Sequence, residues 1–373
     1  MRPGMIAAMI MTRTKAGPLA CRRRLRALGR LRRSGPLTLL VMLLCAASGS
    51  GPARAADEST RATGREASPE IAPAPASHAA APPRPADPAL RLVSLNPSLT
   101  AIVVRLGAAD QLVGIDDYSA RMVPELADRP RVGGLFDPSL EAVMALAPDR
   151  VLLVAGLEQE AHGAALRRLG LAVEVFENER YEQVLGNIAR LGRLVGREAE
   201  AADRIAAIRA LRAAVERAVR GRTAPRTLIV IDRSPLYLVG GGTFLDELLH
   251  AVGAANLGAG VAQGYPRGSL EWLVAAAPEL VLDLSPQSEA PPSEAPQTKA
   301  RANGSEPSDA LAFWSRWPSL PAVKTGRVLA LDATRISLPG PELDRALREL
   351  AVAVHGPDIE PAIERELAKR GTP

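Results

Sequence analysis

Aromatic side chains are rare in this sequence, and three of them occupy loops where a bound molecule could contact them. Phe, Trp and Tyr make up only 3% of the 373 residues. Tyr118 lies in the segment IDDYS, Phe136 in GGLFD and Tyr265 in GYPRG. Rings on loops, rather than on apolar helix faces, suit a large, flat and partly apolar ligand. The alternative is that each loop folds back over its own domain.

The side chains that catalysis or metal binding would need are not spaced for either task. The four histidines, His78, His162, His250 and His355, form no H-x-x-x-H pattern, and no C-x-x-C or G-x-S-x-G pattern occurs. These spacings are typical of zinc sites and serine hydrolases. The run GGGT at 240–243 has no following Lys, which favours a tight turn over a phosphate loop. We therefore predict a protein that is not an enzyme, without a metal site or cofactor.

Short apolar strands alternate with helices from Arg91 onward. Helices are predicted from Asn96 to Gly107 and from Tyr181 to Val195, and both Asn96 and Ser98 suit a cap of the first. The alternation predicts α/β sheets that are mainly parallel, with ligands bound near the carboxyl ends of the strands. The predicted strands are 92–95, 111–115, 151–154, 173–176, 227–231, 281–284 and 328–331.

A long helix from Arg197 to Arg220, closed by Gly221, separates two segments that resemble each other. It has no internal Gly or Pro, and apolar residues recur on it at three- and four-residue spacing. LTAIVVRLGAAD at 99–110 resembles LDELLHAVGAAN at 245–256, and SLEAVMALAPDRVLL at 139–153 resembles SLEWLVAAAPELVLD at 269–283. A repeat of this length indicates a duplicated domain. Phe136 and Tyr265 precede the matching helices of the second repeat pair, one in each half.

These patterns predict two similar lobes, each with a central, mainly parallel sheet, joined by one long bridging helix. The predicted parts are an N-terminal lobe at 90–196, the bridging helix at 197–221, a C-terminal lobe at 222–358 and a tail at 359–373. An Ala- and Pro-rich tether is expected at 56–89, and a second Pro- and Ser-rich stretch at 286–308 interrupts the C-terminal lobe.

Residues 1–55 have the features of a secretory signal peptide. A basic stretch precedes the apolar run PLTLLVMLLCAA at 36–47, and an A-x-A cleavage pattern ends at Ala55. Lipid attachment at Cys45 and an uncleaved membrane anchor are the alternatives. The formal charge of +5 arises from this leader, which holds eleven Lys and Arg and no acid. The remainder is acidic, which argues against nucleic acid as a partner, and a periplasmic monomer is expected.

Four segments resemble the cobalamin-binding periplasmic proteins of ABC importers. They are RLVSLNPSLTAIVVRLGAADQLVGIDDY, RVGGLFDPSLEAVMALAPDRVLL, VGGGTFLDELLHAVGAANL and GYPRGSLEWLVAAAPELVL. These proteins belong to the class III, helical-backbone solute-binding family, which also contains haem and siderophore binders. The resemblance implies two α/β lobes that hold a ligand between them, with no catalytic activity, and an ABC permease as the partner. The alternative is an enzyme or sensor that has kept the fold.

In the cobalamin-binding relatives, aromatic residues that pack on the corrinoid stand where Tyr118 and Tyr265-Pro266 stand here. A third aromatic of those relatives is replaced by Ala155-Gly156-Leu157. The residues expected to contact the ligand are Tyr118, Phe136, Tyr265, Pro266, Arg267, Asn96, Ser98, Gly134, Leu135 and Arg335.

The resemblance also bears on the other ligands of the family and on docking. Haem-binding relatives place a Tyr iron ligand where Leu135 and Phe136 stand, which disfavours haem. A siderophore would rely on Arg267 and Arg335. Docking on the permease through one acidic residue on each lobe is expected at Glu160, with Glu158 close by, and at Glu271.

Overall fold

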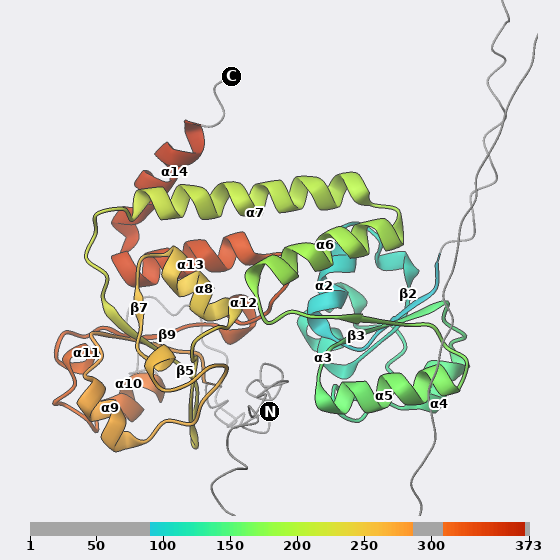
Figure 1. Cartoon of the computed structure of the whole chain (residues 1–373), viewed down its shortest axis with the longest axis horizontal. Coiled ribbons are helices and arrows are strands. Elements are labelled where there is room, and N and C mark those ends of the chain that lie inside the picture. The colour runs from blue at the N-terminus through green and yellow to red at the C-terminus, as the bar shows by residue number, and fades with distance from the viewer. Residues whose placement is uncertain (1–89, 286–308, 370–373) are drawn as a thin grey trace, which may run out of the picture. The chain divides into compact units, whose positions relative to one another are not determined.

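The computed structural model describes residues 90–285 and 309–369, which form two β-sheets with helices packed around them (Figure 1). The predicted signal peptide, the tether and the stretch at 286–308 lie outside these residues. The strands are β1 (Leu92–Ser94), β2 (Leu112–Ile115), β3 (Arg150–Val154), β4 (Val173–Phe176), β5 (Arg226–Arg233), β6 (Leu236–Leu238), β7 (Ala255–Asn256), β8 (Leu280–Asp283) and β9 (Val328–Ala330).

The described α-helices begin with α2, which Asn96 caps as predicted, and end with α14. They are α2 (Pro97–Arg105), α3 (Asp117–Met122), α4 (Leu140–Ala145), α5 (Leu157–Arg168), α6 (Tyr181–Val195), α7 (Glu198–Ala218), α8 (Phe244–Ala251), α9 (Leu270–Ala276), α10 (Asp309–Trp314), α11 (Pro321–Lys324), α12 (Ala333–Ile336), α13 (Leu343–His355) and α14 (Glu360–Ala368). Short 3-10 helices lie at Ala109–Gln111, Pro124–Leu126, Gly258–Gly260 and Pro357–Ile359. None of the described helices is long and apolar enough to cross a bilayer.

The first sheet has the strand order β2-β1-β3-β4 and is parallel throughout. Successive residues of a strand face opposite sides of the sheet. Leu92 and Leu152 accordingly join one core cluster, whereas Val93 and Val151 join another on the opposite side. Both faces are covered, as is usual for a parallel sheet. The predicted strand 173–176 matches β4 in both bounds.

The second sheet has the order β6-β5-β8-β9, with β7 paired to β5. Its β5, β8 and β9 are parallel, but β6 runs antiparallel to β5. The prediction had no strand at β6, because the chain turns back at Ser234-Pro235 after only a short loop. Ile229 and Leu282 face the larger core cluster, and Leu228 and Val281 face a smaller one that contains Trp314.

Helix α7 corresponds to the predicted bridging helix and packs against α6, α13 and α14. Its buried face includes Ile208, Leu211 and Val215, three of the apolar residues whose spacing predicted the helix. Gly221 has a φ of 79°, the left-handed conformation predicted for it after the helix. The predicted tail instead forms α14, where Glu366 accepts a hydrogen bond from Arg217 at 2.8 Å.

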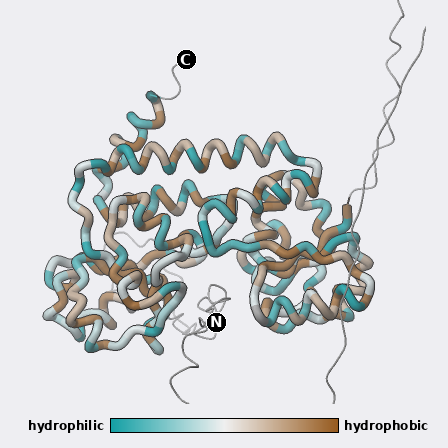
Figure 2. Tube along the Cα trace, in the orientation of Figure 1, coloured by the Kyte–Doolittle hydropathy of each residue, from teal (hydrophilic) through white to brown (hydrophobic). Residues whose placement is uncertain are grey.

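The larger core cluster contains residues from both sides of α7. Ile102 of α2, Leu245 of α8 and Leu347 of α13 all belong to it, together with Val215 of α7 itself. The strands of both sheets are predominantly hydrophobic along the chain trace (Figure 2). The bridging helix is therefore an integral part of the core rather than a spacer between two separate ones.

Candidate ligand-binding site

Asn96 and Ser98 follow β1, at the carboxyl edge of the first sheet, and both are buried. The Asn96 side-chain oxygen accepts hydrogen bonds from the Ser98 amide at 2.9 Å and from the Ser98 hydroxyl at 2.8 Å. Their polar groups therefore serve to cap α2. Both were predicted as ligand contacts. The structure assigns their side chains a local role at the edge where a ligand is expected.

Asp116 follows β2 at the same edge and is fully buried. It accepts hydrogen bonds from the amides of Tyr118 and Ser119 at 2.8 and 3.0 Å, and a very short one from the Ser119 hydroxyl. The Ser119 hydroxyl also lies 2.8 Å from that of Thr100. Burial raises the pKa of Asp116, and these hydrogen bonds oppose the shift. The group is closed to solvent, and it holds α3 in place.

Tyr118 is the second residue of α3 and is only 4% exposed. The guanidinium of Arg121, one helical turn on, lies 4.6 Å from the centre of its ring. Burial raises the pKa of the phenol, the charge of Arg121 lowers it, and that of Asp116 raises it. The ring thus lies beneath an exposed arginine side chain, which would have to move aside for the ring to face a ligand.

The loop that carries Gly134, Leu135 and Phe136 closes on itself. Gly133 has a φ of 98°, and a β-carbon on Gly134 would lie 2.2 Å from a carboxylate oxygen of Asp137. Leu135 is 3% exposed, so its side chain belongs to the interior, whereas Phe136 is partly exposed. Of these three predicted contacts, Phe136 is the one whose side chain can reach a ligand in this conformation.

The matching loop of the second half pairs with β6. The amide of Leu238 donates to the carbonyl of Pro266 at 2.9 Å, and that of Gly240 donates to the carbonyl of Gly264 at 2.7 Å. Tyr265 is partly buried against the larger core cluster. Burial raises the pKa of its phenol strongly, the nearby charge of Glu179 raises it further, and a hydrogen bond with the Thr243 side chain lowers it.

Tyr265 therefore lies where the two halves of the chain meet. Glu179 follows β4 in the first half, and Thr243 caps α8 in the second. Beside them, Arg180 pairs with Glu247 at 3.1 Å, and Glu247 also accepts from the Tyr181 amide at 2.8 Å. Close ring pairs among the described residues involve Phe313, Trp314 and Trp317, so the three predicted aromatics do not stack on one another.

Arg233 at the end of β5 was absent from the prediction. Its Nε lies 3.3 Å from an oxygen of Asp283, which ends β8 and is fully buried. The indole nitrogen of Trp314 donates to the same oxygen at 2.6 Å. Trp314 thereby anchors α10 to the sheet. The position of Arg233, two residues after the predicted strand 227–231, was the signal that could have identified it.

The other predicted arginines differ in their surroundings. Arg267 is exposed, and its backbone forms a bridge to Tyr237. Arg335 forms ion pairs with Asp332 and Glu349, each at 3.5 Å, and its side chain is half exposed. Contact of Arg335 with a ligand would require exchange of these partners, whereas Arg267 has no ion pair among residues 90–285 and 309–369.

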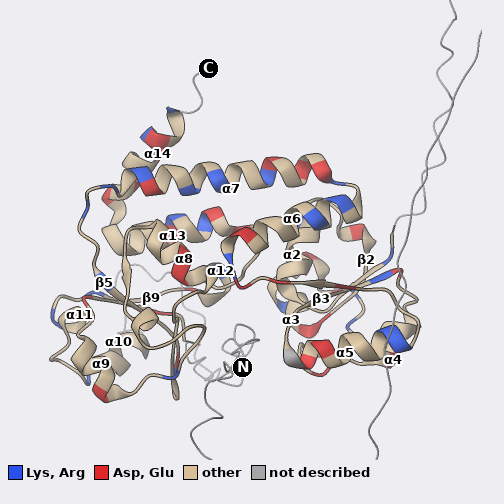
Figure 3. Ribbon diagram, viewed as in Figure 1, with Lys and Arg blue, Asp and Glu red and all other residues tan. Residues whose placement is uncertain are grey.

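The predicted docking residues lie on exposed helix starts. Glu158 and Glu160 are in the first turn of α5, and Glu271 is in the first turn of α9 (Figure 3). Hydrogen bonds from its own amide and from the Ser269 hydroxyl lower the pKa of Glu271, so it is charged at neutral pH. Acidic residues at helix starts also compensate the helix dipole.

No cluster of three His, Cys, Asp or Glu side chains that could hold a metal occurs in the described part of the chain. A cavity of about 1800 Å³ lies near α13 and β9, and none of the predicted ligand residues line it. The candidate site is therefore defined by the strand ends and the two aromatic loops.

Residues 92–334 match the model of the family described as periplasmic binding protein. This chain belongs to that family. A cobalamin-binding protein of Halobacterium salinarum is 28% identical to it over 275 residues, 72% of this chain and 70% of the relative. The family expected from the sequence is confirmed.

Two solved structures show the same fold. A periplasmic vitamin B12 binding protein of Vibrio cholerae has a TM-score of 0.59 and 22% identity, and the match covers 74% of this chain and 98% of that one. A periplasmic heme binding protein of Pseudomonas aeruginosa has a TM-score of 0.59 and 27% identity, over 72% and 94% of the two chains. The predicted class III fold is confirmed.

Proposed function

We propose that this protein is the substrate-binding component of an ABC importer and that it captures a cobalamin-like corrinoid between its two lobes. The observation that carries the proposal is the match to the cobalamin-binding protein of Halobacterium salinarum over nearly three quarters of this chain. The periplasm, reached through the predicted signal peptide, is the proposed location. The ligand is cargo, so the proposal includes no cofactor and no chemical step.

The residues proposed to face the corrinoid are Phe136, Tyr265 and Arg267, with Tyr118 becoming available once Arg121 moves. Tyr265 has a special place among them, because its hydroxyl bonds to Thr243 and its ring lies near Glu179 of the other half. An aromatic face at this junction can contact a flat macrocycle, and its contacts depend on the distance between the two halves.

Titration of the purified protein with cyanocobalamin tests the proposal. We expect saturable one-to-one binding with a submicromolar Kd, which Phe136→Ala weakens by about tenfold or more, the usual cost of losing a buried aromatic contact. Trp317→Ala removes an aromatic that packs with Phe313 near α10 and should leave the affinity unchanged. Absence of cyanocobalamin binding would refute the corrinoid as ligand.

Haem is the second ligand to test, because a solved relative with 27% identity is a heme binding protein. Titration with haemin under the same conditions should give no specific absorption shift, since Leu135 and Phe136 offer no iron ligand. A siderophore remains the alternative if both titrations fail. Tight haemin binding would overturn our interpretation of the loop at 133–137.

Docking on a permease is proposed through Glu160 and Glu271. The double variant Glu160→Gln, Glu271→Gln should bind ligand normally but fail to stimulate the ATPase of its transporter in proteoliposomes. Glu198→Gln is the control, because Glu198 is also an exposed glutamate in the first turn of a helix, α7, outside the two proposed docking positions. Equal loss in the control would show that the effect is one of general surface charge.

A further inference from the structure

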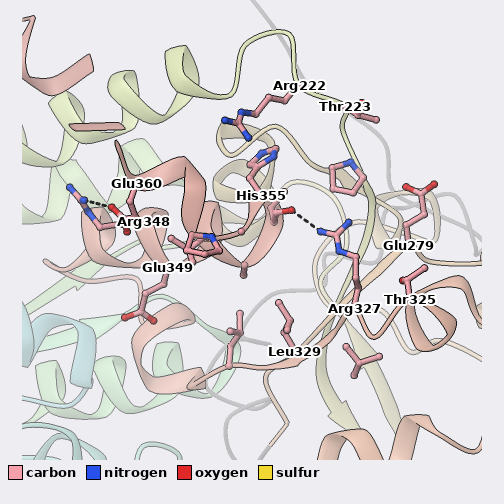
Figure 4. Close-up of a pocket in the computed structure, with 18 of the residues that line it drawn as sticks. Arg222, Thr223, Glu279, Thr325, Arg327, Leu329, Arg348, Glu349, His355 and Glu360 are labelled. Atoms are coloured by element: carbon pink, nitrogen blue, oxygen red, sulfur yellow. Dashed lines mark hydrogen bonds and ion pairs between the residues drawn. The ribbon is translucent and has the colours of Figure 1, made fainter. Parts of the chain in front are cut away.

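A cavity unrelated to the candidate ligand site opens between β9, α13 and the segment that follows α7 (Figure 4). Among the described strands, β9 lies at the edge of the second sheet, and β8 is its paired neighbour. Leu329, Val352 and Ala353 contribute apolar surface to the cavity. Its volume of about 1800 Å³ is ample for a small molecule.

Three cationic or potentially cationic side chains meet in one part of this cavity. Arg222 follows the turn at Gly221, Arg327 precedes β9, and His355 ends α13. Figure 4 shows the Arg222 guanidinium beside the His355 ring, with Arg327 on its other side. Arg327 donates to the Val354 carbonyl at 2.7 Å, which fixes its guanidinium at this place.

His355 is held with one ring nitrogen engaged. Its Nε2 lies 2.7 Å from the Val252 carbonyl, so this nitrogen carries a proton and Nδ1 is the one that gains or loses one. Burial lowers the pKa of His355, the bond to Val252 raises it, and the charges of Arg222 and Arg327 lower it. The ring is consequently neutral at pH 7, within a positive local field.

The carboxylates that line the cavity have other partners. Glu360 pairs with Arg348 at 2.5 Å, Glu349 pairs with Arg345 at 3.1 Å, and Glu279 accepts from the Arg226 amide at 2.9 Å. Within residues 90–285 and 309–369, no carboxylate forms an ion pair with Arg222, Arg327 or His355. The two guanidinium groups have no counter-charge there, and protonation of His355 would add a third positive charge, so an anion would relieve the repulsion among them.

We propose that this part of the cavity binds an anionic group, such as a sulfate, phosphate or carboxylate, between Arg222, Arg327 and His355. The planar guanidinium groups suit the paired oxygens of such anions. Protonated Nδ1 of His355 supplies a third donor. The source is either a free inorganic anion or the charged end of a larger molecule whose apolar body lies along Leu329 and Val352.

Sulfate is the test probe because its charge is constant between pH 5 and 8. We expect sulfate to raise the pKa of His355, followed by NMR of the imidazole protons, and to bind more tightly as the pH falls through that pKa. His250, exposed on α8, reports general salt effects in the same spectra. The site is refuted if sulfate leaves the pKa of His355 unchanged, or if sulfate changes the NMR titrations of His355 and His250 equally.

Two variants separate a specific site from surface charge. Arg222→Ala should weaken sulfate binding about tenfold or more, as expected for loss of a charge-assisted hydrogen bond. Arg220→Ala removes an equally exposed arginine two residues away that does not line the cavity, and should change the affinity less than twofold. Equal losses in the two variants would overturn the proposal.

Benzenesulfonate distinguishes the two sources of the anion. Tighter binding than sulfate, reduced by Val352→Ser, would indicate a larger molecule with an apolar body. Equal affinity of the two probes would indicate a free inorganic anion. Both results support an anion site and differ only in its occupant.

Discussion

Replacing Asp344 with Asn should destabilise the protein by about 2–4 kcal/mol, because it removes the counter-charge of a nearly buried arginine. Arg204 of α7 has a side chain only 10% exposed. Its Nη1 lies 2.9 Å from one oxygen of Asp344, its Nη2 forms a very short contact with the other, and its Nε donates to the Pro341 carbonyl at 2.5 Å. The pair joins the bridging helix to α13.

The magnitude follows from burial and from what remains after the substitution. Breaking a fully buried pair costs about 3–5 kcal/mol, but Asp344 is 24% exposed, and Glu342 stays 3.7 Å from Arg204. We therefore expect a loss of stability in the lower part of the range of about 2–4 kcal/mol. For a chain of this size each kcal/mol lowers Tm by about 2–4 °C, so a decrease of roughly 5–10 °C should be measured by calorimetry.

Glu342→Gln is the matched control for Asp344→Asn. Glu342 pairs with Arg105 at 2.9 Å, but both side chains are about half exposed, so the loss should stay below about 1 kcal/mol. Urea titration of both variants at low and high salt completes the assay. If Asp344→Asn costs no more than Glu342→Gln, or if salt abolishes its cost, the assumption that burial strengthens the Arg204 pair is wrong.

Three further substitutions, and one control for the first of them, test local features. Gly133→Ala should lower the free energy of unfolding in urea by about 2 kcal/mol or more, because the φ of Gly133 is 98° and the new β-carbon would lie 2.8 Å from the Asp137 carbonyl oxygen. The control Gly186→Ala, in open space on α6, should instead raise it by about 0.5–1 kcal/mol. Trp314→Phe should cost about 2–3 kcal/mol by losing the bond to Asp283, and a change in unfolding free energy within 0.5 kcal/mol would contradict that assignment. Burial raises the pKa of Asp116, so the folded state binds the Asp116 proton more tightly than the unfolded state, and this contribution to stability is lost as the pH rises above about 4. The stability of Asp116→Asn relative to the wild type should therefore increase between pH 4.5 and pH 7. A parallel pH dependence of the two proteins would disprove this.

Much of the fold could be predicted because its elements are strongly patterned. Tyr181–Val195 and Val173–Phe176 have the predicted bounds. Arg180 and Gly196 flank the first, and Glu177 follows the second. β6 could not be predicted in the same way. Three residues are too few to show a period, and their strand state depends on pairing with β5 and with the loop at Pro266. α14 was missed although its sequence has helix signals, with Glu360 and Pro361 at its start and Arg365 in its last turn; the structure adds that it packs on α7.

The candidate site was less predictable, because burial of single side chains depends on the assembled structure. The sequence locates Tyr118, Phe136 and Tyr265 in loops next to strands. The structure has Phe136 and Tyr265 in loops, but it places Tyr118 in the first turn of α3. It does not reveal that Asp116 starts a helix in which Arg121 covers Tyr118, or that Leu135 points inward. Arg233 was overlooked because its partner Asp283 is distant in sequence and only the sheet brings them together.

The core cluster that runs through α7 has a consequence for how such a chain can evolve. Duplicated halves often keep the capacity to fold separately, so that one can be exchanged for another by recombination. Here Ile102 on one side and Leu245 and Leu347 on the other share a single cluster with Val215 of the helix between them. Exchange of either half would leave these apolar side chains without their partners and disturb the core, whereas substitution at the loops leaves this cluster intact.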